Sequence, residues 1–147
     1  MANKFFLSLY FIMKILFNNT AFQQECRIIK NGENTVYQYF DDKKILLKTL
    51  EIDKFERDVD TIEYELNGEI KSHLHKDYTQ NGLIETFKDH FQEYKRTIET
   101  VRKGDYTHMI ETYISKTSPN KNYVNEFVKD TAGKLLRIIN NGNIIEI

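Results

Sequence analysis

The placement of the glycines constrains this sequence more than any other feature. Tyr64–Ile70 (YELNGEI) and Tyr78–Ile84 (YTQNGLI) share Tyr, Asn, Gly and Ile at the same spacing, and Ile138–Ile144 (IINNGNI) repeats the Asn-Gly-x-Ile part. The chain has only six glycines, and each falls in a comparable slot. Short hairpin loops often end on a residue in the left-handed conformation, which glycine and asparagine adopt at least cost. The sequence therefore predicts a succession of antiparallel β-hairpins.

The loop length predicts which side chains share a face of the sheet. A three-residue loop that ends at Gly68 places Tyr64 opposite Ile70, so that the large apolar residues meet across the hairpin. A two-residue loop would divide the apolar residues between the two faces, and register follows the face that is buried. The same three-residue loop in the second copy of the pattern places Tyr78 opposite Ile84.

Composition favours strands along the whole chain. Aromatic residues make up 13% of the sequence, Ile and Thr are frequent, and there is a single Pro. Aromatic and β-branched residues are enriched in strands. We expect an all-β fold, an antiparallel meander of about eight to ten short strands in hairpin repeats.

Residues 84–103 permit an alternative α+β fold. Apolar side chains recur there at intervals of three and four residues, which predicts a helix, and Gly104 follows as a possible cap. Against a helix, the segment contains several Thr and aromatic residues, which are poor helix formers. The residues by themselves leave both readings open.

The first residues have the layout of a secretory signal peptide. Lys4 precedes the mostly apolar run Phe5–Phe17, and Ala21 stands at a plausible cleavage point. Lys14 interrupts the apolar run, and the alternative is a helix or strand packed in the core. We expect a signal peptide at 1–21 and a single β-hairpin-repeat domain at 22–147, in a secreted, periplasmic or cell-surface bacterial protein.

Charge and cysteine content limit the partners and the chemistry. The net charge is −1, so no basic field predicts binding to nucleic acid. The apolar run is too short to span a bilayer, and we expect no stable membrane span after signal removal. Cys26 is the only cysteine, so no internal disulfide can form.

Several segments resemble the YD repeat of Rhs-type proteins, whose unit runs Tyr-x-Tyr-Asp-x-x-Gly-x-Leu. The resemblance lies in Tyr37–Lys48 (YQYFDDKKILLK), Ile62–Ile70 (IEYELNGEI) and Val124–Leu135 (VNEFVKDTAGKL), in a degenerate form. Short secreted proteins of this kind occur in Bacteroidetes-type bacteria. The resemblance implies a β-meander without catalytic residues, in which Leu83–Asp89 and Arg96–Arg102 are two strands.

One pair of residues could hold a metal ion. His73 and His75 are two apart, so on a strand both point to the same face. With Gly68 and Gln80 they approximate a cupin metal motif, although that motif has a Glu where Gln80 stands. The hairpin register puts Ile62 on the same face as Leu74. It puts both histidines on the opposite face, among charged residues such as Glu63. We therefore predict no catalytic, cofactor or metal residues, and keep this pair as the metal candidates, to be revisited if that face lines a cavity.

Three functional hypotheses remain. The first is a non-enzymatic secreted or periplasmic β-repeat protein that serves as a binding or structural module for an unknown protein or carbohydrate, without a cofactor. The second is a cupin-like metal-dependent enzyme that uses His73 and His75. The third is a cytoplasmic immunity or adaptor protein, with residues 5–17 in its core.

Overall fold

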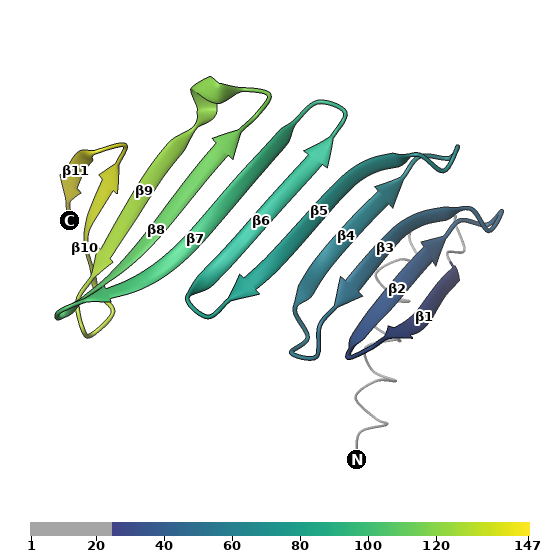
Figure 1. The fold of residues 1–147 in the computed structure, drawn as a ribbon, viewed down its shortest axis with the longest axis horizontal. Coiled ribbons are helices and arrows are strands. Elements are labelled where there is room, and N and C mark those ends of the chain that lie inside the picture. Colours follow the sequence, from purple (N-terminus) through teal and green to yellow (C-terminus); the bar gives the residue numbers. More distant parts are fainter. Residues whose placement is uncertain (1–24) are drawn as a thin grey trace, which may run out of the picture.

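The structure, a computed structural model, describes residues 25–147. The expected signal peptide at 1–21 lies outside the described residues. One open sheet of eleven strands contains almost all of the regular structure (Figure 1). The fold class is thus all-β, as predicted, with one strand more than the expected range.

The strands follow one another across the sheet in the order of the sequence, and every neighbouring pair is antiparallel. A single turn of 3₁₀ helix at Pro119–Lys121 connects two of them. The strands are β1 (Glu25–Asn31), β2 (Asn34–Phe40), β3 (Leu46–Ile52), β4 (Asp58–Tyr64), β5 (Ile70–Thr79), β6 (Gly82–Asp89), β7 (Glu93–Lys103), β8 (Tyr106–Ser115), β9 (Tyr123–Lys129), β10 (Leu135–Asn140) and β11 (Asn143–Glu146).

The first of the two related hairpins has the predicted register. Gly68 has a φ of 85°, its N–H donates to the carbonyl of Glu65 at 2.9 Å, and Tyr64 lies opposite Ile70. A bulge between Glu63 and Tyr64 shifts the ladder beyond this pair. The three-residue loop is therefore confirmed at this hairpin.

The second hairpin differs from the prediction. Thr79 pairs with Gly82 across a two-residue turn, so Tyr78 lies opposite Leu83 and not opposite Ile84. Gly82 does not have a positive φ. A Cβ on Gly82 would stand 1.8 Å from the carbonyl oxygen of Ile98 on β7, so this glycine permits a close approach of two strands.

The alternative helix at 84–103 is wrong. These residues form most of β6, a short turn and β7, and β6 and β7 pair from Gly82–Glu99 to Lys88–Glu93. The backbone N–H groups of Phe91 and Gln92 both donate to Oδ1 of Asp89 at 2.7 Å, which fixes the turn.

The sheet has two faces, which we name by the side chains they carry. The tyrosine face carries Leu74, Phe87, Tyr94, Tyr113 and Tyr123, which follow one another across β5 to β9. The histidine face carries the intervening side chains, among them His73, Ile84, Thr86, His108 and Val128.

The bulge leaves Lys71 on β5 without an opposite residue, and it changes the predicted contents of the two faces. Ile62 lies opposite His73 on the histidine face, although it was expected on the face of Leu74. Glu63 lies opposite Ser72 on the tyrosine face, although it was expected beside the histidines. A one-residue shift in a strand moves its side chains to the other face, which accounts for both differences.

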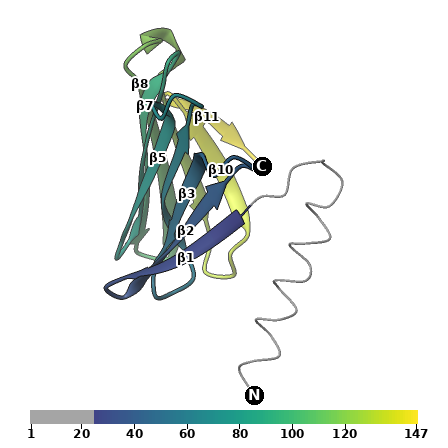
Figure 2. The ribbon, with the colours of Figure 1, turned by 90° about the vertical axis from the view of Figure 1, so that its right-hand side faces the viewer.

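The sheet is a single curved layer. In Figure 2, β7 and β8 lie on one side of the view and β10 and β11 on the other, with no second layer of described elements against either face. Phe40 and Val128 are the only buried hydrophobic side chains among the described residues. Cross-strand contacts on both faces must therefore supply much of the stabilisation that an enclosed core supplies in a compact domain. Within residues 25–147, no helix has the length and apolar character needed to cross a membrane.

Candidate functional site

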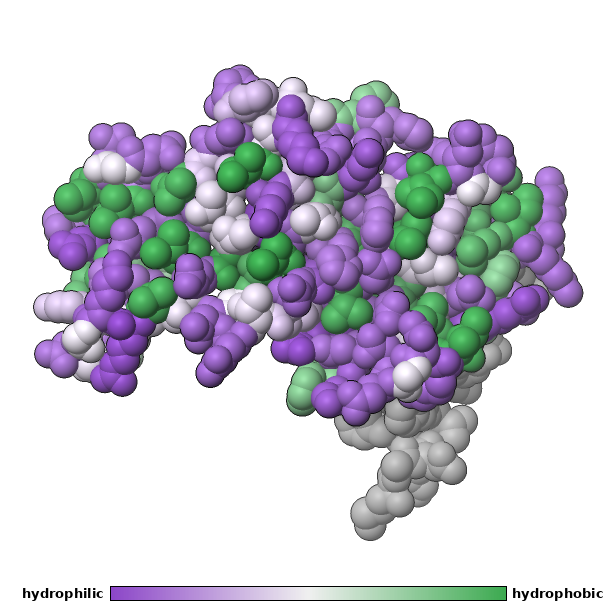
Figure 3. All heavy atoms as spheres, in the orientation of Figure 1, coloured by the Kyte–Doolittle hydropathy of each residue, from purple (hydrophilic) through white to green (hydrophobic). Residues whose placement is uncertain are grey.

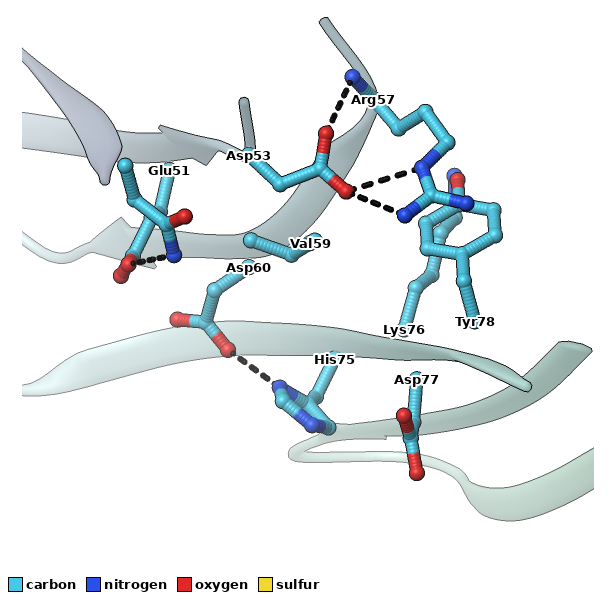
Figure 4. Close-up of a pocket in the computed structure, with 10 residues that line it drawn as sticks. Glu51, Asp53, Arg57, Val59, Asp60, His75, Lys76, Asp77 and Tyr78 are labelled. Carbon is cyan, nitrogen blue, oxygen red and sulfur yellow. Dashed lines mark hydrogen bonds and ion pairs between the residues drawn. The ribbon is translucent and has the colours of Figure 1, made fainter. Parts of the chain in front are cut away.

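A pocket of about 360 Å³ opens where β4 and β5 separate (Figure 4). The β4–β5 ladder runs from Tyr64–Ile70 to Asp60–His75 and stops there, although both strands continue. The pocket is lined from three sides, by the ends of these strands, by the β3–β4 loop and by residues of β2 and β3. These residues are Asn34, Glu51, Asp53, Arg57, Val59, Asp60, His75, Lys76, Asp77 and Tyr78.

Side chains replace the missing backbone pairing between the two strands. The ammonium group of Lys76 on β5 donates to Oδ2 of Asp58 on β4, and this hydrogen bond raises the pKa of Lys76. The hydroxyl of Tyr78 donates to the backbone carbonyl of Asp58 at 3.3 Å. The separated strand ends are therefore still held together, by bonds from the tyrosine face.

The β3–β4 loop at the mouth of the pocket is tightly bonded. Both oxygens of Asp53 are used: Oδ1 accepts from the backbone N–H groups of Phe55 and Arg57, and Oδ2 accepts from the guanidinium group of Arg57 at 2.6 and 2.8 Å. The hydrogen bond from Arg57 holds the pKa of Asp53 below its usual value. The same guanidinium group lies 4.2 Å from the ring centre of Tyr78, which joins the loop to β5.

The two candidate histidines share one carboxylate. Nε2 of His73 lies 2.8 Å and Nδ1 of His75 lies 3.0 Å from the same oxygen, Oδ1 of Asp60. Glu51 lies opposite Asp60 in the next strand, and its carboxylate accepts from the side-chain amide of Asn34 at 2.7 Å. The sequence correctly placed both histidines on one face, but Asp60 and the pocket beside His75 could be found only from the register of three strands.

The described residues contain no group of three or more His, Cys, Asp or Glu side chains arranged to hold a metal ion. The other histidines have partners elsewhere. His90 lies 4.0 Å from Glu65 between two neighbouring loops, and Nδ1 of His108, which is 9% exposed, contacts Glu126 on β9. Only His73 and His75 share a partner, and neither His90 nor His108 joins them.

The lining of the pocket is rich in charged side chains. Its lining includes four acidic residues, two basic residues and one histidine, and no Ser, Thr or Cys. Both basic side chains are engaged by acids within the structure: Arg57 by Asp53 and Lys76 by Asp58. The pocket is therefore a polar recess at the ends of the strands, with more acidic than basic side chains in its lining.

A row of four neighbouring aromatic rings crosses the tyrosine face. The ring centres are 5.3 Å apart for Phe87 and Tyr94, 5.0 Å for Tyr94 and Tyr113, and 5.3 Å for Tyr113 and Tyr123. The row joins β6, β7, β8 and β9. Aromatic pairs at this spacing stabilise neighbouring strands beyond the area that they bury.

A row of bonded polar groups accompanies the rings. The Tyr94 hydroxyl donates to Glu85, the Tyr123 hydroxyl donates to Glu111 at 3.1 Å, and Arg96 donates to the same Glu111 at 2.6 Å. Burial, followed by the nearby charge of Glu85, raises the pKa of Tyr94 to about 12. Burial and the bond to Glu111 also raise the pKa of Tyr123. No local pattern in the sequence reveals this row, because it depends on the cross-strand registers of four consecutive strands.

Comparisons of the chain with protein-family models, with curated proteins and with solved structures found no match.

Proposed function

We propose that this protein is a non-enzymatic β-hairpin-repeat module that is exported from a bacterial cell and binds a protein or carbohydrate partner on its sheet. One observation carries the proposal: a single layer of eleven strands leaves both faces open, with only Phe40 and Val128 buried among the hydrophobic side chains of residues 25–147. Side chains that would form the core of a compact domain are accessible to a partner here. The resemblance to YD repeats and the layout of the first 21 residues support the export part of the proposal.

The tyrosine face is the better candidate for the contact surface. Its row of half-buried aromatic rings offers large, rigid, amphipathic side chains, which lose little entropy when a partner binds. Arg96 and Glu111 supply charged groups beside the rings. Figure 3 shows one side of the sheet and does not label the aromatic row; on that side, apolar side chains lie in small groups among polar ones.

A photo-crosslinking experiment in the native host tests the choice of face. Thr100 on β7 and Thr86 on β6 are both exposed threonines, but they lie on the tyrosine face and the histidine face respectively. A benzophenone amino acid at Thr100 is expected to give a discrete adduct of one size, and the same group at Thr86 is the matched control. Adducts of equal yield from both positions, or from neither, would contradict a contact on the tyrosine face.

Fractionation of the host cells, with intact-mass measurement, tests the export part separately. We expect the protein outside the cytoplasm, shortened by about 21 residues, as the signal-peptide layout predicts. A full-length chain in the cytoplasm would rule out export and would favour the immunity or adaptor alternative.

A further inference from the structure

Among residues 25–147, the sheet ends in two strands that have no neighbour on their outer side. β1 and β11 stand at the two ends of the strand order, and every residue of both is exposed. Ile28 and Ile29 on β1 are 62% and 46% exposed, and Ile144 and Ile145 on β11 are 61% and 54% exposed. Each strand therefore presents backbone N–H and C=O groups together with apolar side chains, which is the template that another strand recognises.

The usual protections of an edge strand are missing from β1. Natural edges are often blocked by a proline, a bulge or an outward-pointing lysine. The β1–β2 ladder is regular from Glu25–Phe40 to Asn31–Asn34, and the strand contains no proline.

The two basic side chains of β1 also leave the edge open, because both lean toward β2. The Lys30 ammonium group donates to Oγ1 of Thr35 at 2.6 Å. The Arg27 guanidinium group donates to Glu25 on the same strand at 2.8 Å and lies 4.6 Å from the ring centre of Phe40 on β2. Within the described part of the chain, the backbone groups on the outer side of β1 therefore have no hydrogen-bond partner.

We propose that β11 of one copy of this chain pairs with β1 of the next copy, which extends the sheet from molecule to molecule. Strands alternate in direction across the sheet, and β1 and β11 are both odd in the order, so they run in the same direction. A second copy placed beside the first without rotation then forms a parallel pair with the same faces aligned. Such a contact is heterologous, and it repeats into an open assembly.

Charge and side-chain character select the register of this pair. When Glu146 lies beside Arg27 of the next copy, both are on the histidine face, and Ile145 lies beside Cys26 on the tyrosine face. Glu146 is opposite Arg137 within its own chain, but it makes no ion pair with any residue in the part of the chain that the structure describes. The pairing therefore places Glu146 beside the Arg27 guanidinium group, which Glu25 also contacts. One residue beyond β11, Ile147, whose N–H donates to Leu136 of its own chain, then lies beside Ile28, and both side chains are more than half exposed before pairing.

A mixing experiment tests the head-to-tail arrangement. Sedimentation velocity of protein purified from the native host is expected to show species that grow with concentration. Ile28→Lys blocks β1 and Ile145→Lys blocks β11, so each variant alone is expected to be monomeric, whereas a mixture of the two forms a dimer and nothing larger. Leu66→Lys, at a loop residue that is 70% exposed, is the matched control and is expected to assemble like the parent protein.

The outcomes separate this arrangement from its alternatives. A dimer that survives Ile145→Lys but not Ile28→Lys would show a symmetric β1–β1 contact and overturn the proposal. Assembly that neither variant affects, or a parent protein that stays monomeric up to millimolar concentration, would overturn it as well. Circular dichroism of each variant establishes that the sheet is retained, since both substituted side chains are exposed.

A thiol experiment tests the register. In an Ile145→Cys variant, the introduced thiol and Cys26 of the next copy lie at the separation of neighbouring strands, which a disulfide can bridge. Mild oxidation is expected to give a ladder of dimers, trimers and larger species on a non-reducing gel. The parent chain has only Cys26, so it can give dimers at most. Leu66→Cys is the control, and a ladder as strong from this variant, or none from Ile145→Cys, would overturn the register.

Discussion

The hydroxyl of Tyr94 on β7 donates a hydrogen bond of 3.1 Å to Oε1 of Glu85 on β6, a residue that is only 8% exposed. Glu85 also lies between Lys76 and Arg96 in the strand order, so a carboxylate is held among groups that offset its charge. In a sheet with very few buried apolar side chains, such a bonded polar row contributes to the attachment of one strand to the next.

Tyr94→Phe should destabilise the sheet through this bond alone. The substitution keeps the ring between Phe87 and Tyr113 but removes the donor to a buried carboxylate, and such a loss costs about 1–2 kcal/mol. Urea denaturation followed by circular dichroism measures the change. Tyr113→Phe is the matched control, since its ring is stacked in the same row without a side-chain hydrogen bond to a described residue, and we expect a change below about 0.5 kcal/mol. Equal effects of the two substitutions would contradict a role for the Glu85 bond.

The same tyrosine should make stability depend on pH in the alkaline range. The pKa of Tyr94 is raised to about 12 in the folded protein, above its usual value of 10.0 in the unfolded chain. The folded state therefore retains the proton longer, so the contribution of Tyr94 is complete below pH 10 and disappears as the pH rises to about 12. We expect the stability difference between the parent protein and Tyr94→Phe to shrink across this interval. A difference that stays constant to pH 12 would show that the proton of Tyr94 is not linked to folding.

Substitution of the two related glycines by alanine should lower the stability by different amounts, because the two positions are under different structural constraints. Gly82→Ala places a Cβ against the backbone of Ile98 and forces two strands apart, which we expect to cost about 2–4 kcal/mol. Gly68→Ala meets no atom within 4 Å but must adopt a φ of 85°, which should cost about 1–2 kcal/mol. Urea denaturation of both variants measures the order. A larger loss for Gly68→Ala would contradict the close approach at Gly82.

These glycines also show how far the sequence determines the fold. The repeated phrase correctly predicted two hairpins, but the two phrases fold with different loops and registers. At Gly68 the requirement is local, a positive φ, and local sequence reveals it. At Gly82 the requirement is the carbonyl of Ile98 on another strand, and no local pattern contains that information.

The helical pattern at 84–103 has a similar explanation. Ile84 lies on the histidine face and Phe87 on the tyrosine face of the same strand, so apolar residues occur on both sides of the layer. A sheet with one buried face would show strict alternation, whereas a single layer need not. The apolar intervals in such a strand can then match those of a helix.

The aromatic row and the site at Asp60 could not be predicted from the sequence for another reason. Each depends on the registers of three or four strands together.

The last prediction concerns the loop at the mouth of the pocket. Asp53→Asn retains an oxygen that can accept from the backbone N–H groups of Phe55 and Arg57, but it removes the charge that binds the Arg57 guanidinium group. We expect a lower thermal midpoint at pH 7. Asp42→Asn, at a turn residue for which no side-chain hydrogen bond or ion pair is found within residues 25–147, is the control and should leave the midpoint unchanged.

Lowering the pH should remove the difference between the parent protein and Asp53→Asn. The pKa of Asp53 is held below its usual value of 3.8 by the hydrogen bond from Arg57, so its contribution is present above that value and is lost as the pH falls through the folded pKa. Thermal midpoints of the two proteins are therefore expected to converge below pH 4, in a low-salt buffer that does not screen the pair. If the midpoints differ by the same amount at pH 7 and at pH 2, the stabilisation comes from the shape of the loop and not from the charge of Asp53. Arg57 would then hold the loop against Tyr78 without help from its carboxylate partner, and Arg57→Lys, which keeps a charge but loses the planar group over the ring, would be the more damaging change.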